Sequence, residues 1–146
     1  LFRSPDAALL NRSHDDWHSL LPKYGTVVQN FRLMDRAGHP LWPKDGPLHA
    51  ISAIAQTCDG HIVFLHCSDP VSIHAFALVL GQHPELDIKD CLYAEGGKEA
   101  SLMVEQNGSI RVWSGMNPWR CLFIAAGQGA SIPNVLGVRR KYSLRH

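Results

Sequence analysis

The chain has 146 residues, which is enough for one domain with a hydrophobic core. Hydrophobic residues make up 45% of the chain and charged residues 18%, a balance typical of globular proteins. The formal net charge of +1 gives no general electrostatic reason to expect a nucleic acid as partner. No apolar run approaches the length that a membrane-spanning helix needs, so no membrane span is predicted.

The N-terminal third of the chain gives few local signals. Residues 1–22 are mixed and polar, and we predict a short helical turn that ends at Pro22. Thr26–Met34 is rich in β-branched and apolar residues and predicts a strand. The stretch at 35–47 is dense in glycine and proline, which predicts a loop.

A hairpin is predicted for the two apolar runs at 49–57 and 61–67. They are separated by Cys58-Asp59-Gly60, and Asp-Gly is a strong turn signal because glycine tolerates a positive φ. Both runs are apolar on both faces, which indicates strands in the middle of a covered sheet. On one face we expect Ile54, Val63 and Leu65, and on the other Ala53, Ala55, Ile62 and Phe64.

A helix is predicted next, beginning at Ser68-Asp69-Pro70, because a capping side chain followed by proline favours a helix start. Gly81 is placed to end it. One apolar face is expected from the i, i+3, i+4, i+7 spacing of Ile73, Phe76, Ala77 and Leu80.

The rest of the chain predicts strands with little further helix. Strands are expected at 91–94, 100–106 and 109–115, with a turn at Asn107-Gly108 between the last two. Residues 115–131 look irregular, and 132–140 predicts a closing strand. The predicted fold is therefore α+β: a mixed, largely antiparallel β-sheet with one main helix packed on it.

The segment Glu95-Gly96-Gly97-Lys98-Glu99 is the leading candidate for chemistry. Adjacent glycines let a backbone approach a ligand closely, and a carboxylate at the end of a buried strand suits acid–base catalysis. Glu99 is a second carboxylate for a pair of the kind that glycoside hydrolysis uses. A solvent-facing turn is the alternative interpretation.

Other candidate residues carry weaker signals. Arg32 lies on a predicted strand and could bind phosphate or carboxylate, although a surface ion pair explains it equally well. His66 ends a predicted strand beside the predicted helix, where Ser68 and Asp69 could form an anion pocket. No nucleophile elbow, phosphate-binding loop or dinucleotide motif is present.

Four segments in order resemble the phosphodiester glycosidase family, which includes the mannose-6-phosphate uncovering enzyme. They are "YGTVVQNFRLM", "SAIAQTCDGHIVFLHCSDPVSIHAFA", "CLYAEGGKEASLMV" and "IPNVLGV". The Glu-Gly-Gly-x-Glu-Ala motif is similar to that of one bacterial branch of the family. The family's N-terminal Asn-Gly-Gly motif is absent, so residues 1–146 are expected to form a single domain that corresponds to the C-terminal portion of the family domain. Residues 1–22 are its poorly defined N-terminal segment.

The resemblance implies a hydrolase that acts on a sugar-1-phosphodiester or a related glycosidic linkage. It places Glu95, Gly96 and Gly97 in the acidic-glycine motif and Asn134 in the closing motif, and it matches Arg32 and His74 to residues of the bacterial branch. The implied partner is a small carbohydrate or sugar phosphodiester, with a missing N-terminal half or a second chain completing the site. An extracytoplasmic location, periplasmic or secreted, is expected.

Two alternatives to this hydrolase stay open. One is a non-catalytic carbohydrate-binding or cell-envelope module on the same scaffold. The other is a metal-dependent hydrolase that uses His66 or His74, although no histidine pair has the spacing of metal ligands. No metal and no cofactor are therefore predicted.

Overall fold

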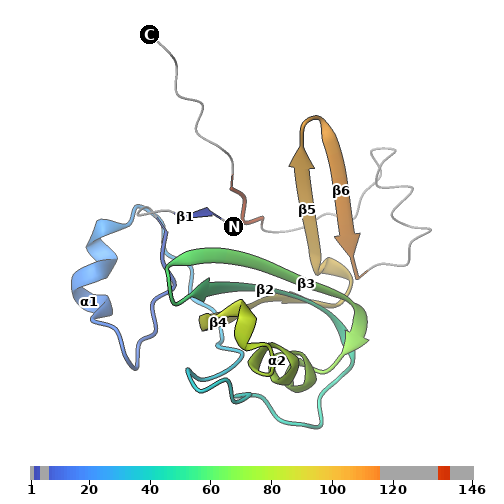
Figure 1. The fold of residues 1–146 in the computed structure, drawn as a ribbon, viewed down its shortest axis with the longest axis horizontal. Helices are drawn as coiled ribbons and strands as arrows, with labels where there is room; N and C mark the ends of the chain where they lie inside the picture. The colour runs from blue at the N-terminus through green and yellow to red at the C-terminus, as the bar shows by residue number, and fades with distance from the viewer. Residues whose placement is uncertain (1, 4–6, 116–134, 139–146) are drawn as a thin grey trace.

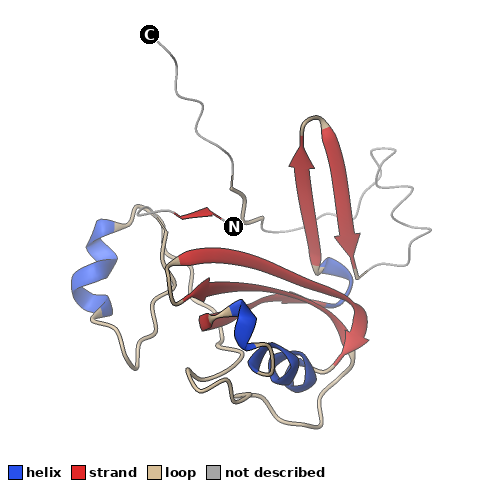
Figure 2. Cartoon of the chain, in the orientation of Figure 1, coloured by secondary structure: helices blue, strands red, loops and turns tan. Residues whose placement is uncertain are grey.

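The computed structural model describes residues 2–3, 7–115 and 135–138. A four-stranded sheet has the strand order β1-β3-β2-β4, and a separate two-stranded sheet is formed by β5 and β6. All strand pairings among the described residues are antiparallel, and the main helix α2 packs on one face of the larger sheet (Figures 1 and 2). The predicted α+β class is confirmed. The strands are β1 (Phe2–Arg3), β2 (His49–Thr57), β3 (His61–Val71), β4 (Ile88–Gly96), β5 (Ser101–Gln106) and β6 (Ser109–Ser114).

The helical elements are short. They are α1 (Trp17–Leu20), α2 (Ile73–Gly81) and three 3₁₀ turns at Leu21–Lys23 (η1), Pro84–Leu86 (η2) and Gly97–Glu99 (η3). The predicted N-terminal helical turn is confirmed, except that η1 carries it one residue past Pro22. Within the described residues, no helix has the length and apolar character that crossing a bilayer requires.

The central hairpin of β2 and β3 is confirmed, but its predicted faces were wrong. The loop at 58–60 has three residues, so residues of the same parity lie opposite each other: Ala55 pairs with Val63 and Ile54 with Phe64. Opposed residues share a face. Our prediction placed even-numbered residues of one strand on the same face as odd-numbered residues of the other. This is a register error of one residue, which exchanges the two faces of one strand.

The helix α2 begins later than predicted. Ser68, Asp69 and Pro70 belong to β3, where three residues bulge opposite Ala50 between the pairs Ile51–Cys67 and His49–Val71. The helix cap is Ser72, whose hydroxyl accepts a hydrogen bond from Ala75 N at 3.1 Å. Proline lacks an N–H and is tolerated at such a bulge, so the Ser-Asp-Pro signal does not require a helix.

The hydrophobic core lies between α2 and the sheet. Ala77 and Leu80 of the helix are buried there, and Ile73 and Phe76 pack partly buried against the same cluster, as the predicted helix face requires. Burying a leucine side chain such as that of Leu80 contributes roughly 1.5–3 kcal/mol. The other buried members of the cluster are Leu33, Met34, Ala53, Ala55 and Cys91.

The strand predicted at Thr26–Met34 is not formed. Only isolated bridges occur, Arg32 to Leu92 and Met34 to Pro40, although Leu33 N also bonds Cys91 O at 2.9 Å. Val27 and Val28 are exposed and pair with no described strand. β-branched residues favour strands mainly through packing against neighbours, and this segment reaches a neighbour only at its C-terminal end.

The β5–β6 hairpin stands away from the larger sheet (Figure 1). Its turn is the predicted Asn107-Gly108, with φ values of +53° and +75° that match the type of turn expected. A closing strand was predicted at 132–140, but the described part of it, residues 135–138, forms a loop. The segment predicted as irregular, 115–131, lies outside the described residues except for Gly115.

Candidate functional site

Glu95 lies near the end of β4, beyond a β-bulge. Ala53 pairs with Tyr93 but Ser52 pairs with Glu95, so Ala94 is an extra residue in β4. The bulge places Glu95 across from Ser52, on the sheet face opposite α2. The Glu95 side chain is exposed, and its Oε1 accepts a hydrogen bond from Gly96 N at 2.9 Å.

The glycine pair after Glu95 has a structural explanation. A Cβ on Gly96 would lie 2.0 Å from Tyr93 Oη and 2.7 Å from a ring carbon of His49, so a side chain there would require Tyr93 and His49 to move. Gly97 has a φ of +76°, which favours glycine. A Cβ on Gly115 would lie 2.2 Å from Gly97 O, so the hairpin end packs closely on this kink.

Three predicted site residues lie on one face of the sheet. His66 and Glu95 both pair with Ser52, from opposite sides, and form one row across the sheet. The neighbouring row contains Ile54, Leu92 and Arg32, since Leu92 pairs with Ile54 and is bridged to Arg32. Arg32, His66 and Glu95 therefore occupy adjacent rows on the face opposite α2.

His66 is held by two serines. Its Nδ1 lies 2.9 Å from Ser52 Oγ, and its Nε2 lies 3.0 Å from Ser68 Oγ. Ser52 is buried and also donates to Ser101 O on β5 at 3.2 Å. Burial lowers the pKa of His66, so its neutral form is favoured.

Sequence reasoning missed Ser52. The pairing of Ser52 with His66 across the predicted hairpin could have identified it. That pairing follows only when the turn is counted as three residues, 58–60, so that even-numbered residues lie opposite even-numbered ones. The anion pocket predicted at Ser68 and Asp69 assumed that a helix begins there. This assumption was wrong, because α2 begins at Ile73.

The remaining predicted site residues lie elsewhere. Glu99 lies on η3 and forms an ion pair with Lys98 at 3.5 Å. His74 lies on α2, on the other side of the sheet, where its Nδ1 is 2.8 Å from Trp42 O. Asn134 lies outside the described residues. Among the residues that the structure does describe, no group of three or more histidine, cysteine or acidic side chains could hold a metal ion.

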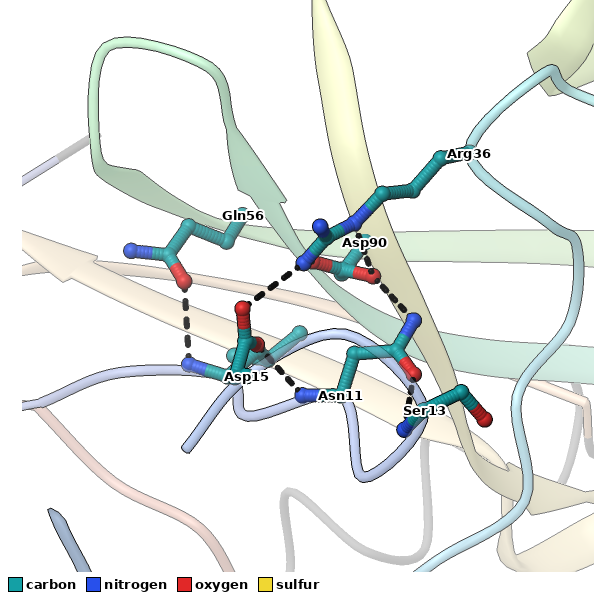
Figure 3. Close-up of polar contacts among 7 residues, drawn as sticks. Asn11, Ser13, Asp15, Arg36, Gln56 and Asp90 are labelled. Carbon is teal, nitrogen blue, oxygen red and sulfur yellow. Dashed lines mark hydrogen bonds and ion pairs between the residues drawn. The ribbon is translucent and has the colours of Figure 1, made fainter. Parts of the chain in front are cut away.

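A second polar cluster, drawn in Figure 3, lies where Gln56 pairs with Asp90, at the other end of the same sheet face. Asp90 accepts from Asn11 Nδ2 at 2.8 Å and from Arg36 Nη2 at 3.1 Å, and Arg36 also bridges to Asp15 at 3.0 Å. Leu9 N donates to Gln56 Oε1 at 3.0 Å. These contacts fasten the N-terminal segment to the sheet.

Comparison of the chain with protein-family models, with curated proteins and with solved structures found no match. The resemblance to phosphodiester glycosidases therefore stays a prediction, based on the four sequence segments alone.

Proposed function

We propose that this chain forms part of a hydrolase that acts on a sugar-1-phosphodiester or a related glycosidic linkage. The observation that carries the proposal is the row formed by Glu95, Ser52 and His66, with Arg32 in the row beside it. A carboxylate, a histidine whose neutral form is favoured by burial and an arginine on one sheet face are suited to hydrolysis of an anionic substrate.

The proposed roles follow from the chemistry of each group. Glu95 is exposed at the end of β4, so a substrate can reach it, and it would act as acid, base or nucleophile. Arg32 carries a planar guanidinium that binds two oxygens of a phosphate at once. The kink at Gly96 and Gly97 would hold the sugar or phosphate through its backbone.

The test is an assay of a chromogenic sugar phosphodiester with the intact protein and with Glu95→Gln. We expect the substitution to lower kcat by about 100-fold or more, since that is what loss of a general acid or base usually costs. The matched control is Glu105→Gln, which makes the same change at an exposed position on β5. Equal turnover by Glu95→Gln and wild type would refute the role of Glu95.

A non-catalytic carbohydrate-binding module is the second candidate, and a hollow on the β5–β6 hairpin favours it. The hollow has a volume of about 420 Å³, and Trp113 beside it is 41% exposed. Exposed tryptophans often stack on sugar rings. Glycan binding without turnover, measured by calorimetry, would support this candidate, and detectable hydrolysis would exclude it. The lining residues are Val104, Gln106, Asn107, Ser109, Arg111 and Trp113.

A further inference from the structure

The hydrogen bonds around His66 have a fixed direction. A carbonyl oxygen only accepts, so the bond between Ser52 Oγ and Ser101 O uses the single hydroxyl proton of Ser52. Ser52 Oγ must then accept from His66 Nδ1–H at 2.9 Å. A neutral imidazole protonated at Nδ1 has a lone pair at Nε2, and this lone pair accepts from the hydroxyl of Ser68 at 3.0 Å.

We propose that Ser68 is a catalytic nucleophile, that His66 is its general base and that Ser52 orients the imidazole. The order of contacts is that of a serine hydrolase, in which one ring nitrogen of the histidine faces the nucleophile and the other faces an orienting acceptor. Here the buried hydroxyl of Ser52 takes the place of the usual carboxylate. This arrangement does not need the nucleophile elbow that the sequence lacks.

The position of Ser68 fits a nucleophile. It lies at the start of the β3 bulge, where the strand departs from regular pairing with β2, and it is exposed. Ser52 at the other end of the chain of bonds is buried, so its hydroxyl is shielded from competing water. The lowered pKa of His66 keeps Nε2 available as an acceptor at neutral pH.

The surroundings of Ser68 favour a neutral carboxylic ester as substrate. Asp69 follows Ser68 directly, and its carboxylate disfavours an anionic substrate at Ser68. The reaction is therefore acyl transfer, which goes beyond the proposed phosphodiester hydrolysis and does not depend on it.

The reaction would proceed through an acyl-enzyme. Ser68 Oγ forms a bond to the acyl carbon while its proton passes to His66 Nε2. The bond to the alcohol oxygen then breaks, and the departing alcohol takes this proton. Water attacks the acyl carbon next and gives a proton to Nε2, and Ser68 leaves with that proton as a free hydroxyl.

The first test is covalent labelling with an uncharged alkyl fluorophosphonate, followed by intact mass and peptide mapping. We expect one adduct on Ser68, formed with loss of fluoride. Ser68→Ala should abolish the adduct, and His66→Gln should slow its formation by about 100-fold or more. Ser13→Ala is the control, because Ser13 is an exposed serine in the N-terminal segment. Absence of an adduct, or an adduct that persists in Ser68→Ala, would overturn the proposal.

The second test does not require any variant to fold. The ¹⁵N chemical shifts of the His66 ring in the wild-type protein report which nitrogen carries the proton. We expect the Nδ1–H form, which the Ser52–Ser101 bond dictates. An Nε2–H form would mean that Nε2 donates to Ser68 and cannot act as its base, which would contradict the assignment.

Discussion

The sheet face opposite α2 carries two polar clusters, one at each end. The two clusters differ in the groups at which their hydrogen bonds end. Around Asp90, both carboxylates meet donors: Asn11 and Arg36 reach Asp90, and Arg36 also reaches Asp15. Around His66, the hydrogen bonds run in one line from a backbone carbonyl through Ser52 to Ser68, and Ser68 is exposed.

This difference separates a cluster that holds the fold from one that can react. The Asp90 cluster ends on protein groups and ties a segment to the sheet. The His66 chain contains no charged group and ends on a hydroxyl that solvent can reach. We therefore expect substitutions in the Asp90 cluster to affect stability, and substitutions near Ser68 to affect reactivity.

The largest effect is expected from Asp90→Ala. Asp90 is 5% exposed, and its loss leaves Asn11 without its acceptor and Arg36 with only one of its two carboxylates. Breaking a buried ion pair typically costs about 3–5 kcal/mol, and we expect the lower end because Arg36 is partly exposed. Chemical denaturation measures the loss, and faster amide exchange at Leu9 would show release of the segment.

Asp45→Ala is the control for this substitution. Asp45 is an exposed loop residue, so its change should lie within about 0.5 kcal/mol of wild type. If both aspartate variants lose the same stability, the Asp90 cluster does not hold the fold in the way described.

A smaller loss of stability is expected from Ser52→Ala. The substitution leaves a buried N–H of His66 and the carbonyl of Ser101 without their partner, which costs about 1–3 kcal/mol. Ser68→Ala removes an exposed hydroxyl from the same chain and should change stability by less than about 0.5 kcal/mol. If the two variants lose the same stability, the distinction between a buried structural serine and an exposed reactive one is contradicted.

The smallest expected effect is a loss of stability in acid that occurs in two steps, the first of them due to His66. Burial lowers the pKa of His66, so its contribution to stability is complete above its ordinary value of 6.5 and declines as pH falls from there toward the folded-state pKa. His66→Gln should remove this step from unfolding curves measured against pH. Unchanged pH dependence in this variant would show that His66 titrates alike in both states.

Asp15 should supply the second step, at lower pH. Burial works to raise its pKa, but the hydrogen bond from Asn11 N and the guanidinium of Arg36 outweigh this and hold the pKa below its ordinary value of 3.8. Its contribution is therefore complete above 3.8 and is lost as pH falls through the folded-state pKa. Asp15→Asn should flatten the curve of stability against pH in this range. An unaltered slope of that curve would argue against the ion pair between Asp15 and Arg36.

Local signals predicted the elements that depend on local chemistry. The turns at Asp59-Gly60 and Asn107-Gly108 need positive φ at glycine, and both formed hairpins where the sequence places them. The apolar spacing around Ala77 and Leu80 predicted the buried helix face correctly. The strand at Thr26–Met34 failed because its local composition could not reveal how little of it would find a partner.

The candidate site was only partly predictable for a related reason. Glu95, Arg32 and His66 could be proposed from residue type and resemblance, but their common face depends on pairing between distant strands. The bond between Ser52 and His66 required the correct loop parity, and that between Asn11 and Asp90 joins residues 79 positions apart. No local pattern contains such information.

The bulge at Ala94 also bears on how this surface could change through evolution. In regular alternation Glu95 would share a face with Tyr93, against the core beneath α2, whereas the extra residue moves it to the opposite face. A change of one residue in strand length can thus carry a carboxylate from one side of a sheet to the other. An insertion or deletion of one codon here could create or erase a reactive surface without altering any functional side chain.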